Sequence, residues 1–379
     1  MSNLLSSTYR KREMIFLDKL FVDLGKNSYN ILFSTDFSGL SSAVKEVVKS
    51  PKILIVTDSN VEKLYKNEVE KLLTDAGFSV SVHTFSAGEE NKNLKTIEGI
   101  CKAAVDSRLD RKSTILALGG GVVGDMAGFA AAIYMRGIDF IQVPTTLLSQ
   151  SDSSVGGKTG IDFEGGKNIL GAFHQPKLVY INTNVLKTLP EREFVSGMGE
   201  VIKHGIIADK EFFEYVSENF DAIRKLDNDI LLKMCKKNCS IKARVVSQDE
   251  KEHGIRAHLN FGHTIGHAIE SYFDYTLTHG ECVGIGMCAA AHIAKKRGLI
   301  DDNVFNSIGE ILLKYGFRTK LEIDDAKKVL EIMYLDKKTD NGKLTFVLPT
   351  SIGEVIKLSD ISDDEILDSL ESIRIREDS

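Results

Sequence analysis

The first half of the chain alternates short apolar runs with stretches of helical periodicity. The apolar runs lie in segments of seven to nine residues and lead into glycine, threonine or other polar residues, while the stretches between them repeat their apolar positions every three to four residues. Such alternation predicts a parallel sheet covered by helices, with ligands gathered at the carboxyl ends of the strands. The predicted strands are 52–60, 78–85, 113–121 and 140–146, and the predicted helices are 60–77, 93–109 and 122–135.

From about residue 190 helical periodicity dominates. We therefore predict an α/β N-terminal domain with a mainly parallel sheet over 1–185 and a C-terminal, mainly helical domain over 186–379, packed closely around a cleft. The predicted C-terminal elements are helices at 211–223, 229–246, 262–273, 280–298, 303–316 and 324–335, with a hairpin at 343–358 and an acidic amphipathic helix at the end.

Composition excludes several classes of protein. The net charge of -6 argues against broad nucleic-acid binding, which needs a basic surface. Five scattered cysteines do not make a disulfide framework. Cys235 and Cys239 are either ordinary residues of a helix or two ligands of a metal, although no second cysteine pair with zinc-ribbon spacing is present in the sequence. The N-terminus does not read as a secretory signal and the most apolar stretch, 282–294, is too short for a membrane span, so we expect a cytoplasmic protein without membrane contact.

The segment "LALGGGVVGDMAG" places three glycines between a predicted strand and a helix. Gly119, Gly121 and Gly124 satisfy G-x-G-x-x-G, which lets the backbone and the helix N-terminus approach a phosphate. The next strand ends in Thr145 and Thr146, without the acidic residue of an ordinary dinucleotide fingerprint. The segment is therefore either a phosphate cradle of another kind or a tight turn without a ligand.

The segment 151–176 is glycine-rich and too irregular for one element. It carries Asp152, Lys158, Lys167 and Asn168. A flexible backbone with two lysines is suited to wrapping an anionic small molecule, whereas the alternative is a long solvated loop.

Two further segments contain metal-ligand residue types. Glu200 and Lys203, in "SGMGEVIKHG", share a helix face, as a routine ion pair also would. His263 and His267 lie four apart on the polar face of 262–273, followed by His279. Two histidines and a carboxylate form a catalytic zinc-type ligand set, although a solvated polar helix face explains the spacing equally well.

Together these segments resemble the 3-dehydroquinate synthases, which are sugar-phosphate cyclases. The resemblance extends from about residue 58 to 338. It rests on "LGGGVVGDMAGFAA", "YMRG", "VPTTLLSQSDSSVGGKTGID", "GGKNILGAFHQP", "MGEVIKHG", "RAHLNFGHTIGHAIE" and "HGECVGIGM", in that order. It implies an N-terminal NAD-binding domain and a C-terminal domain that binds metal and substrate.

The resemblance also implies a ligand set and a substrate pocket. One divalent metal, zinc or cobalt, is expected on Glu200, His263 and His279, while His267 is expected on the substrate side. The residues expected to line the pocket are Asp152, Lys158, Asn168, Lys203, Lys242, Arg256, Asn260, His267 and one of Lys337 or Lys338.

For NAD, the matching positions follow several of the predicted strands. They are Asp58, Asn60, Glu89, Lys92, Gly120, Gly121, Asp125, Thr145, Thr146, Lys158, Lys167, Thr188, Leu189 and Glu193.

The reaction implied is conversion of 3-deoxy-D-arabino-heptulosonate 7-phosphate to 3-dehydroquinate and phosphate, in the shikimate pathway. NAD is consumed and regenerated within each turnover, so net redox is zero. Arg136, in "YMRG", matches a position that reaches the neighbouring subunit's phosphate site, which implies a homodimer.

Three alternatives stay open from the sequence. Another sugar-phosphate cyclase, of the valiolone or inosose type, would share the NAD and metal sites. A metal-dependent NAD alcohol or glycerol dehydrogenase would share the glycines and histidines but would not need the lysines of "GGKTG" and "GGKN". A non-catalytic metabolite-binding protein would have lost part of the ligand set.

Overall fold

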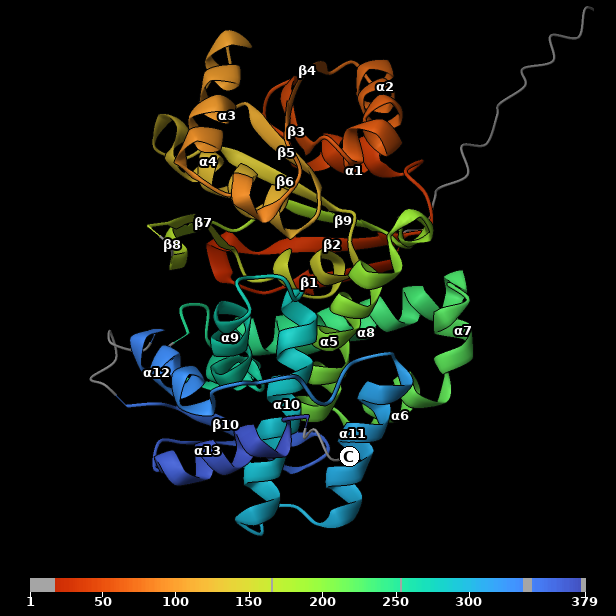
Figure 1. Cartoon of the computed structure of the whole chain (residues 1–379). Coiled ribbons are helices and arrows are strands. Elements are labelled where there is room, and N and C mark those ends of the chain that lie inside the picture. The colour runs from red at the N-terminus through yellow and green to blue at the C-terminus, as the bar shows by residue number, and fades with distance from the viewer. Residues whose placement is uncertain (1–17, 165, 253, 337–342, 376–379) are drawn as a thin grey trace, which may run out of the picture.

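A computed structural model describes residues 18–164, 166–252, 254–336 and 343–375. A seven-stranded sheet flanked by helices forms the upper part of the molecule in Figure 1, and a helical part lies below it. The fold is thus the expected α/β arrangement with a mainly parallel sheet followed by a mainly helical region. The expected boundary near residue 185 stays a prediction.

The sheet has the order β1-β2-β9-β6-β5-β3-β4, and every neighbouring pair is parallel except β1 with β2. The carboxyl ends of the six strands other than β1 therefore share one edge. The strands are β1 (Asp18–Val22), β2 (Tyr29–Ser34), β3 (Lys52–Asp58), β4 (Ser79–Phe85), β5 (Thr114–Gly119), β6 (Asp139–Pro144) and β9 (Leu178–Asn182).

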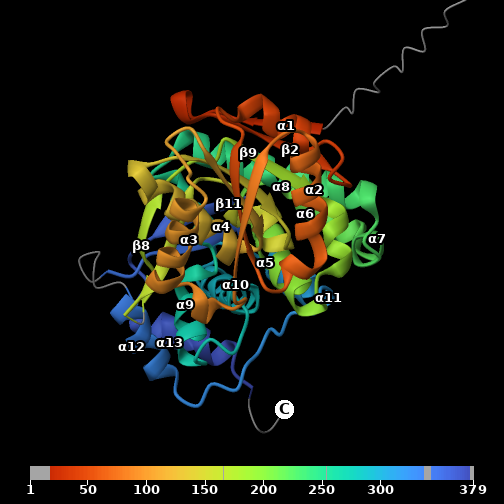
Figure 2. The same ribbon diagram turned by 90° about the horizontal axis from the view of Figure 1, so that it is seen from above.

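Alternate residues of each strand face opposite layers. On β5, Leu116 and Leu118 pack against α1 (Leu40–Val47) and α2 (Asn67–Asp75). Ile115 and Ala117 pack against α3 (Leu94–Asp106) and α4 (Gly121–Ile133). Figure 2 shows α2 and α3 on opposite sides of the strands.

The helical part covers the rest of the sheet face on which α3 and α4 lie. Ile31 and Phe33 of β2 and Val179 and Ile181 of β9 belong to the same buried cluster as residues of the C-terminal helices. The helices are α5 (Glu191–Ala208), α6 (Lys210–Glu218), α7 (Phe220–Arg224), α8 (Asn228–Gln248), α9 (His263–Tyr272), α10 (His279–Lys296), α11 (Asp302–Lys314), α12 (Ala326–Asp336) and α13 (Asp363–Ser372), with the hairpin β10 (Phe346–Ser351) and β11 (Glu354–Leu358).

Glycines bring α10 unusually close to its neighbours. A methyl group on Gly280 would lie 1.9 Å from the Ser196 carbonyl oxygen of α5, and one on Gly286 would lie 1.9 Å from the Gly262 carbonyl oxygen before α9. Because only glycine fits these contacts, the three helices that carry the site are fixed relative to one another by backbone contact.

The segment 151–176 is not the irregular loop expected from its glycines. A π-helical turn, η5 (Ser149–Ser153), leads into the antiparallel hairpin β7 (Lys158–Phe163) and β8 (Gly166–Phe173). Gly160 and Gly171 face each other across it, and a methyl group on Gly171 would lie 2.3 Å from the Thr159 carbonyl oxygen. Glycine at these positions permits the close pairing but removes the apolar alternation by which a strand is recognised.

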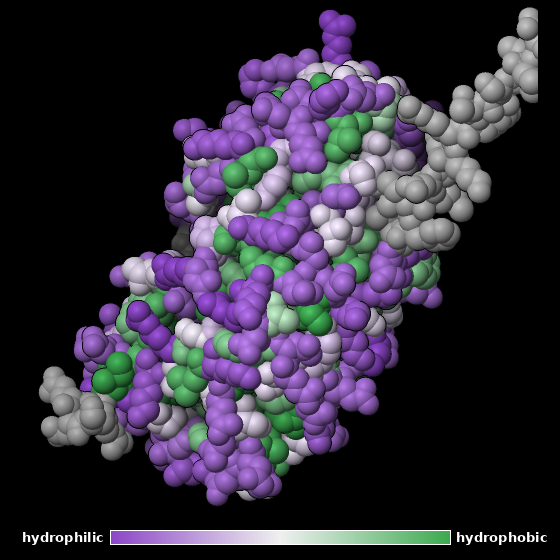
Figure 3. All heavy atoms as spheres, turned by 90° about the vertical axis from the view of Figure 1, so that its right-hand side faces the viewer, coloured by the Kyte–Doolittle hydropathy of each residue, from purple (hydrophilic) through white to green (hydrophobic). Residues whose placement is uncertain are grey.

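The face in Figure 3 is mostly hydrophilic, with small separate apolar areas. Across the described ranges, none of the helices combines the length and apolarity that a membrane-spanning segment requires.

Candidate active site

Most of the predicted nucleotide-binding residues lie at or beyond the carboxyl ends of five parallel strands, whereas Lys158 and Lys167 lie in the β7–β8 hairpin. Asp58 ends β3, Gly120 and Gly121 join β5 to α4, and Thr145 follows β6, where its N–H donates to the Gly119 carbonyl at 2.9 Å. Asn60 follows β3, Glu89 and Lys92 follow β4, Thr146 follows β6, and Thr188, Leu189 and Glu193 follow β9. The N-terminus of α4 begins at this edge, where its free N–H groups suit a phosphate.

Lys92 joins the nucleotide side to the β7–β8 hairpin. Its buried ammonium lies 2.7 Å from Asp125 Oδ2 on α4 and donates to Asn168 Oδ1 at 2.6 Å. Burial lowers the pKa of Lys92, but the charges of Asp125 and Glu89 outweigh it and raise the pKa overall. Asn168, expected to line the substrate pocket, therefore lies at the hairpin's turn beside residues of the nucleotide side.

Three helices bring Glu200, His263 and His279 together. Glu200 Oε1 lies 3.4 Å from His263 Nε2 and 3.3 Å from His279 Nε2. One ligand atom from each residue falls within 4.8 Å of the others. His267 lies beside this cluster, with its ring centroid 5.3 Å from that of His263 and 6.0 Å from that of His279.

The hydrogen bond of the His263 ring indicates that a metal cation can bind between His263 and Glu200. His263 Nδ1 lies 3.1 Å from the Phe261 carbonyl oxygen, which only accepts, so Nδ1 carries the proton and Nε2 presents its lone pair to Glu200. Two electron-pair donors then face each other at 3.4 Å in a buried site. Two imidazoles and one carboxylate with an open position are the donors of a catalytic zinc-type site, so the residues fit a divalent metal.

The surrounding charges and burial shift the pKa values of the three predicted ligands in different ways. Burial would raise the pKa of Glu200, but Lys203, whose ammonium contacts its Oε2, and the hydrogen bond with His279 hold that pKa well below its usual value. Burial and the charge of Lys203 hold the pKa of His263 well below its usual value. Burial would lower the pKa of His279, but the carboxylates of Glu200 and Glu270 outweigh it and raise the pKa to about 9.

A group of cationic side chains lies next to this cluster, each paired with a carboxylate. Lys242 Nζ lies 2.8 Å from Asp152 Oδ1 and donates to the Asp152 carbonyl at 2.7 Å. Lys158 contacts Glu252 Oε2, and Asn260 Nδ2 donates to Glu252 Oε1 at 3.3 Å. Burial would raise the pKa of Asp152, but Lys242, Lys203 and His204 hold it well below its usual value.

Arg256 is the largest of the fully buried side chains. Its guanidinium donates to the Glu250 carbonyl and, at 3.2 Å, to the Gly156 carbonyl. Gly156 has a φ of 103°, and a methyl group there would lie 2.7 Å from the guanidinium, so glycine is required beside this cation.

Four further residues of the site carry no role in the sequence-based prediction. His204 Nδ1 donates to Asn238 Oδ1 at 2.9 Å, and Asn238 Nδ2 donates to the Ser151 carbonyl at 2.6 Å. These two hydrogen bonds orient the His204 ring, whose Nε2 lies 3.4 Å from Asp152 Oδ1. The spacing of His204, four residues after Glu200, was the available signal; Asn238, Glu252 and Glu270 gave none that separates them from surface polar residues.

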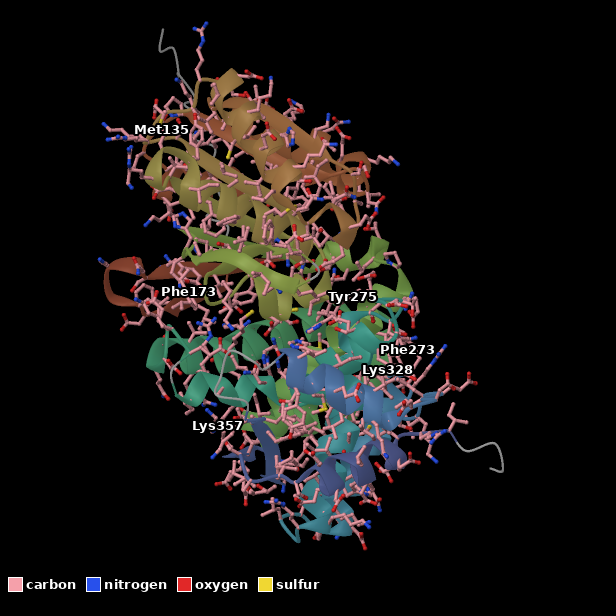
Figure 4. All side chains as sticks on the ribbon, turned by 60° about the vertical axis from the view of Figure 1, so that its left-hand side comes forward. Met135, Phe173, Phe273, Tyr275, Lys328 and Lys357 are labelled. Carbon is pink, nitrogen blue, oxygen red and sulfur yellow. The ribbon has the colours of Figure 1, made fainter. Side chains whose placement is uncertain are left out.

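Of the described residues predicted for the site, Arg136 is not brought to it. Arg136 is exposed at the far end of α4, about 20 Å from the glycine turn by helix rise, and the adjacent Met135 lies at the upper end of the molecule in Figure 4. A contact of Arg136 with the site of its own chain is therefore excluded by this geometry. Lys337 and Lys338 lie outside the described residues.

Comparison with known proteins gives matches over most of the chain. A family model described as 3-dehydroquinate synthase N-terminal matches residues 82–196, and one described as 3-dehydroquinate synthase C-terminal matches residues 197–339. The 3-dehydroquinate synthase of Acetivibrio thermocellus is 52% identical over 350 residues, or 92% of this chain and 97% of that protein. That of Thermoanaerobacter sp. is 46% identical over 353 residues, or 93% and 99%.

Solved structures share the fold. The 2-deoxy-scyllo-inosose synthase complexed with carbaglucose-6-phosphate, NAD+ and Co2+ superposes with a TM-score of 0.82 at 26% identity, covering 94% of this chain and all of that one. The 2-epi-5-epi-valiolone synthase of Streptomyces hygroscopicus, with NAD+ and Zn2+ bound, gives 0.85 at 24% identity, covering 91% and 96%. An NADH-dependent butanol dehydrogenase of Thermotoga maritima gives 0.64 at 16% identity, covering 91% and 96%. The sequence matches at about half identity, over nearly the whole length of both proteins, decide the family: the chain belongs to the 3-dehydroquinate synthases.

Proposed function

We propose that this chain is an enzyme that converts 3-deoxy-D-arabino-heptulosonate 7-phosphate to 3-dehydroquinate and phosphate, with NAD and one divalent metal, zinc or cobalt, as cofactors. It would act as a carbon–oxygen lyase, because phosphate is eliminated without net redox. The observation that carries the proposal is the convergence of Glu200, His263 and His279, with Lys203 in contact with Glu200, in a chain of this family. A cytoplasmic location stays a prediction.

Glu200, His263 and His279 would hold the metal. When bound, NAD supplies reversible hydride transfer and the divalent metal supplies polarisation of the oxygen being oxidised. Lys203 balances the buried charge of Glu200 and keeps it ionised, while the lowered pKa of His263 keeps that imidazole neutral at pH 7, as a metal ligand must be.

Lys158, Lys242 and Arg256 would bind the phosphate and carboxylate of the substrate, because they are cations among the described residues predicted to line the pocket. Asp152 is kept ionised by Lys242 and is suited to accept a hydrogen bond from a substrate hydroxyl. Asn260 and His267 would orient the remaining polar groups, and Asn168 would do so from the hairpin.

The nucleotide would occupy the carboxyl edge of the sheet, with its pyrophosphate at Gly120, Gly121 and the N-terminus of α4. Thr145 and Thr146 replace the acidic residue of an ordinary Rossmann site. A homodimer, with Arg136 reaching the partner's site, is consistent with the exposure of Arg136, Ile133 and Met135.

The test is phosphate release from 3-deoxy-D-arabino-heptulosonate 7-phosphate with NAD and zinc, followed together with NADH absorbance. We expect metal- and NAD-dependent phosphate release without accumulating NADH. Steady NADH formation without phosphate would instead identify a dehydrogenase. Turnover of a different sugar phosphate only would identify another cyclase.

A further inference from the structure

Glu270 is a buried carboxylate on α9 that faces both the proposed metal cluster and the β7–β8 hairpin. Only 3% of the residue is exposed. We infer that Glu270 is a positioning residue: one of its oxygens orients the metal ligand His279, and the other anchors the hairpin through Lys167. The inference rests on the metal site of the proposed function.

The first half of the inference comes from the two ring nitrogens of His279. Nε2 lies 3.3 Å from Glu200 Oε1, and Nδ1 lies 4.0 Å from Glu270 Oε2. The distance between His279 Nδ1 and Glu270 Oε2 is that of an ion pair. A histidine that gives Nε2 to a metal carries its proton on Nδ1, and a carboxylate facing that proton fixes the ring and strengthens the ligand. Glu270 occupies this place.

The second half comes from Lys167, the second residue of β8. Its ammonium lies 2.6 Å from Glu270 Oε1, 3.9 Å from Glu89 Oε1 and 4.7 Å from the centroid of the Tyr275 ring. Side chains from α9, from the turn directly after it and from the segment after β4 therefore surround one lysine near the turn of the hairpin. Tyr275 lies where the sheet part meets the helical part in Figure 4.

The hairpin needs such an anchor. Ile169 and Phe173 on the outer side of β8 are 63% and 48% exposed, so apolar packing secures this strand only on its other side. The Lys167–Glu270 pair joins its turn to α9. Since the same carboxylate faces His279, metal binding and the order of the hairpin are linked, and the linkage acts in both directions.

Zinc affinity, measured by competition with a chromophoric chelator, tests the metal half. We expect Glu270→Gln, which keeps the shape but removes the charge, to bind zinc about 10- to 100-fold more weakly than the wild type. Lys167→Met should bind zinc within about threefold of the wild type, because Glu270 and His279 remain. Glu310→Gln, an exposed residue of α11, is the matched control and should equal the wild type.

Hydrogen exchange of 158–173 tests the hairpin half. We expect faster exchange there in both Glu270→Gln and Lys167→Met than in the wild type, and protection by zinc only in the wild type and Glu310→Gln. Unaltered exchange in Lys167→Met would overturn the hairpin anchor. Unaltered zinc affinity in Glu270→Gln would overturn the positioning of His279.

A further variant separates this inference from the proposed function. If Glu200→Gln binds zinc as tightly as the wild type, the proposed metal site itself is wrong. If Glu200→Gln loses zinc while Glu270→Gln keeps it, only the inference about Glu270 fails. Far-UV circular dichroism identifies any variant that does not fold, and Glu270→Asp, which keeps the charge on a shorter side chain, then replaces Glu270→Gln.

Discussion

At the scale of single residues, the ion pair of Glu200 and Lys203 decides how the site behaves without metal. Both side chains are almost completely buried. Lys203→Met should destabilise the metal-free protein by about 3–5 kcal/mol, because the buried Glu200 carboxylate loses the ammonium that contacts its Oε2. Saturating zinc should remove most of this loss, since a cation on Glu200 takes over the compensation. Urea unfolding of wild type and variant, with and without zinc, measures the difference, and an equal loss in both conditions would contradict it.

His279 gives the metal-free protein a specific pH dependence. Its pKa is raised to about 9 in the folded chain, against about 6.5 for an unfolded histidine. The stabilisation is therefore complete below pH 6.5 and is lost as the pH rises through 9. Urea midpoints of the metal-free protein should fall over this window more in the wild type than in His279→Gln.

The same proton must leave when a metal binds. Zinc binding at pH 7.5 should release a proton from His279, which calorimetry in two buffers of different ionisation enthalpy detects. A binding enthalpy independent of the buffer would show that His279 is already neutral.

The sequence predicted the residues of the metal cluster only through the family resemblance. Spacing alone paired His263 with His267, whereas the structure places Glu200 nearest to His263 and His279. A carboxylate from α5 and a histidine at the start of α10 are separated in sequence by 79 residues, and no local pattern reports their approach. Their roles as ligands stay a prediction.

At the scale of elements, the glycines of α10 set the distance between the helices of the site. Gly286→Ala should destabilise the protein by about 3 kcal/mol or more, because the methyl group would overlap the Gly262 carbonyl, which is backbone and cannot turn away. Gly309→Ala is the matched control: it lies in α11 with nothing within 4 Å of the new methyl group, and should stabilise by up to about 1 kcal/mol. Thermal or urea unfolding of both variants checks the pair.

The elements with strong periodicity were predictable and the others were not. The predicted strands at 52–60 and 113–121 correspond to β3 and β5, whose sequences are apolar on both faces. The strand β9 was not predicted, because a run of four apolar residues does not distinguish a strand from a buried turn of helix. The hairpin β7–β8 was not predicted because its paired glycines show no alternation.

At the scale of the whole molecule, the sheet and the helical part share one apolar cluster. Phe33→Ala, at a position 1% exposed on β2, should destabilise the protein by about 3–5 kcal/mol, in both parts together. Hydrogen exchange against urea should give one midpoint for 113–121 in the sheet and for 282–294 in α10. Phe21→Ala, 57% exposed on β1, should change stability by less than about 0.5 kcal/mol. Separate midpoints would mean that the two parts unfold independently.

The pairing of Lys158, Lys167, Lys203 and Lys242 with carboxylates has a consequence for discrimination among anions. An inorganic phosphate ion that binds one of these lysines must break an existing ion pair and leaves the carboxylate without its cation. Its net free energy of binding is therefore small. A molecule that carries two anionic groups and several hydroxyls satisfies the separated partners as well. We therefore expect these paired side chains to bind simple anions weakly and to favour a ligand that exchanges several contacts at once.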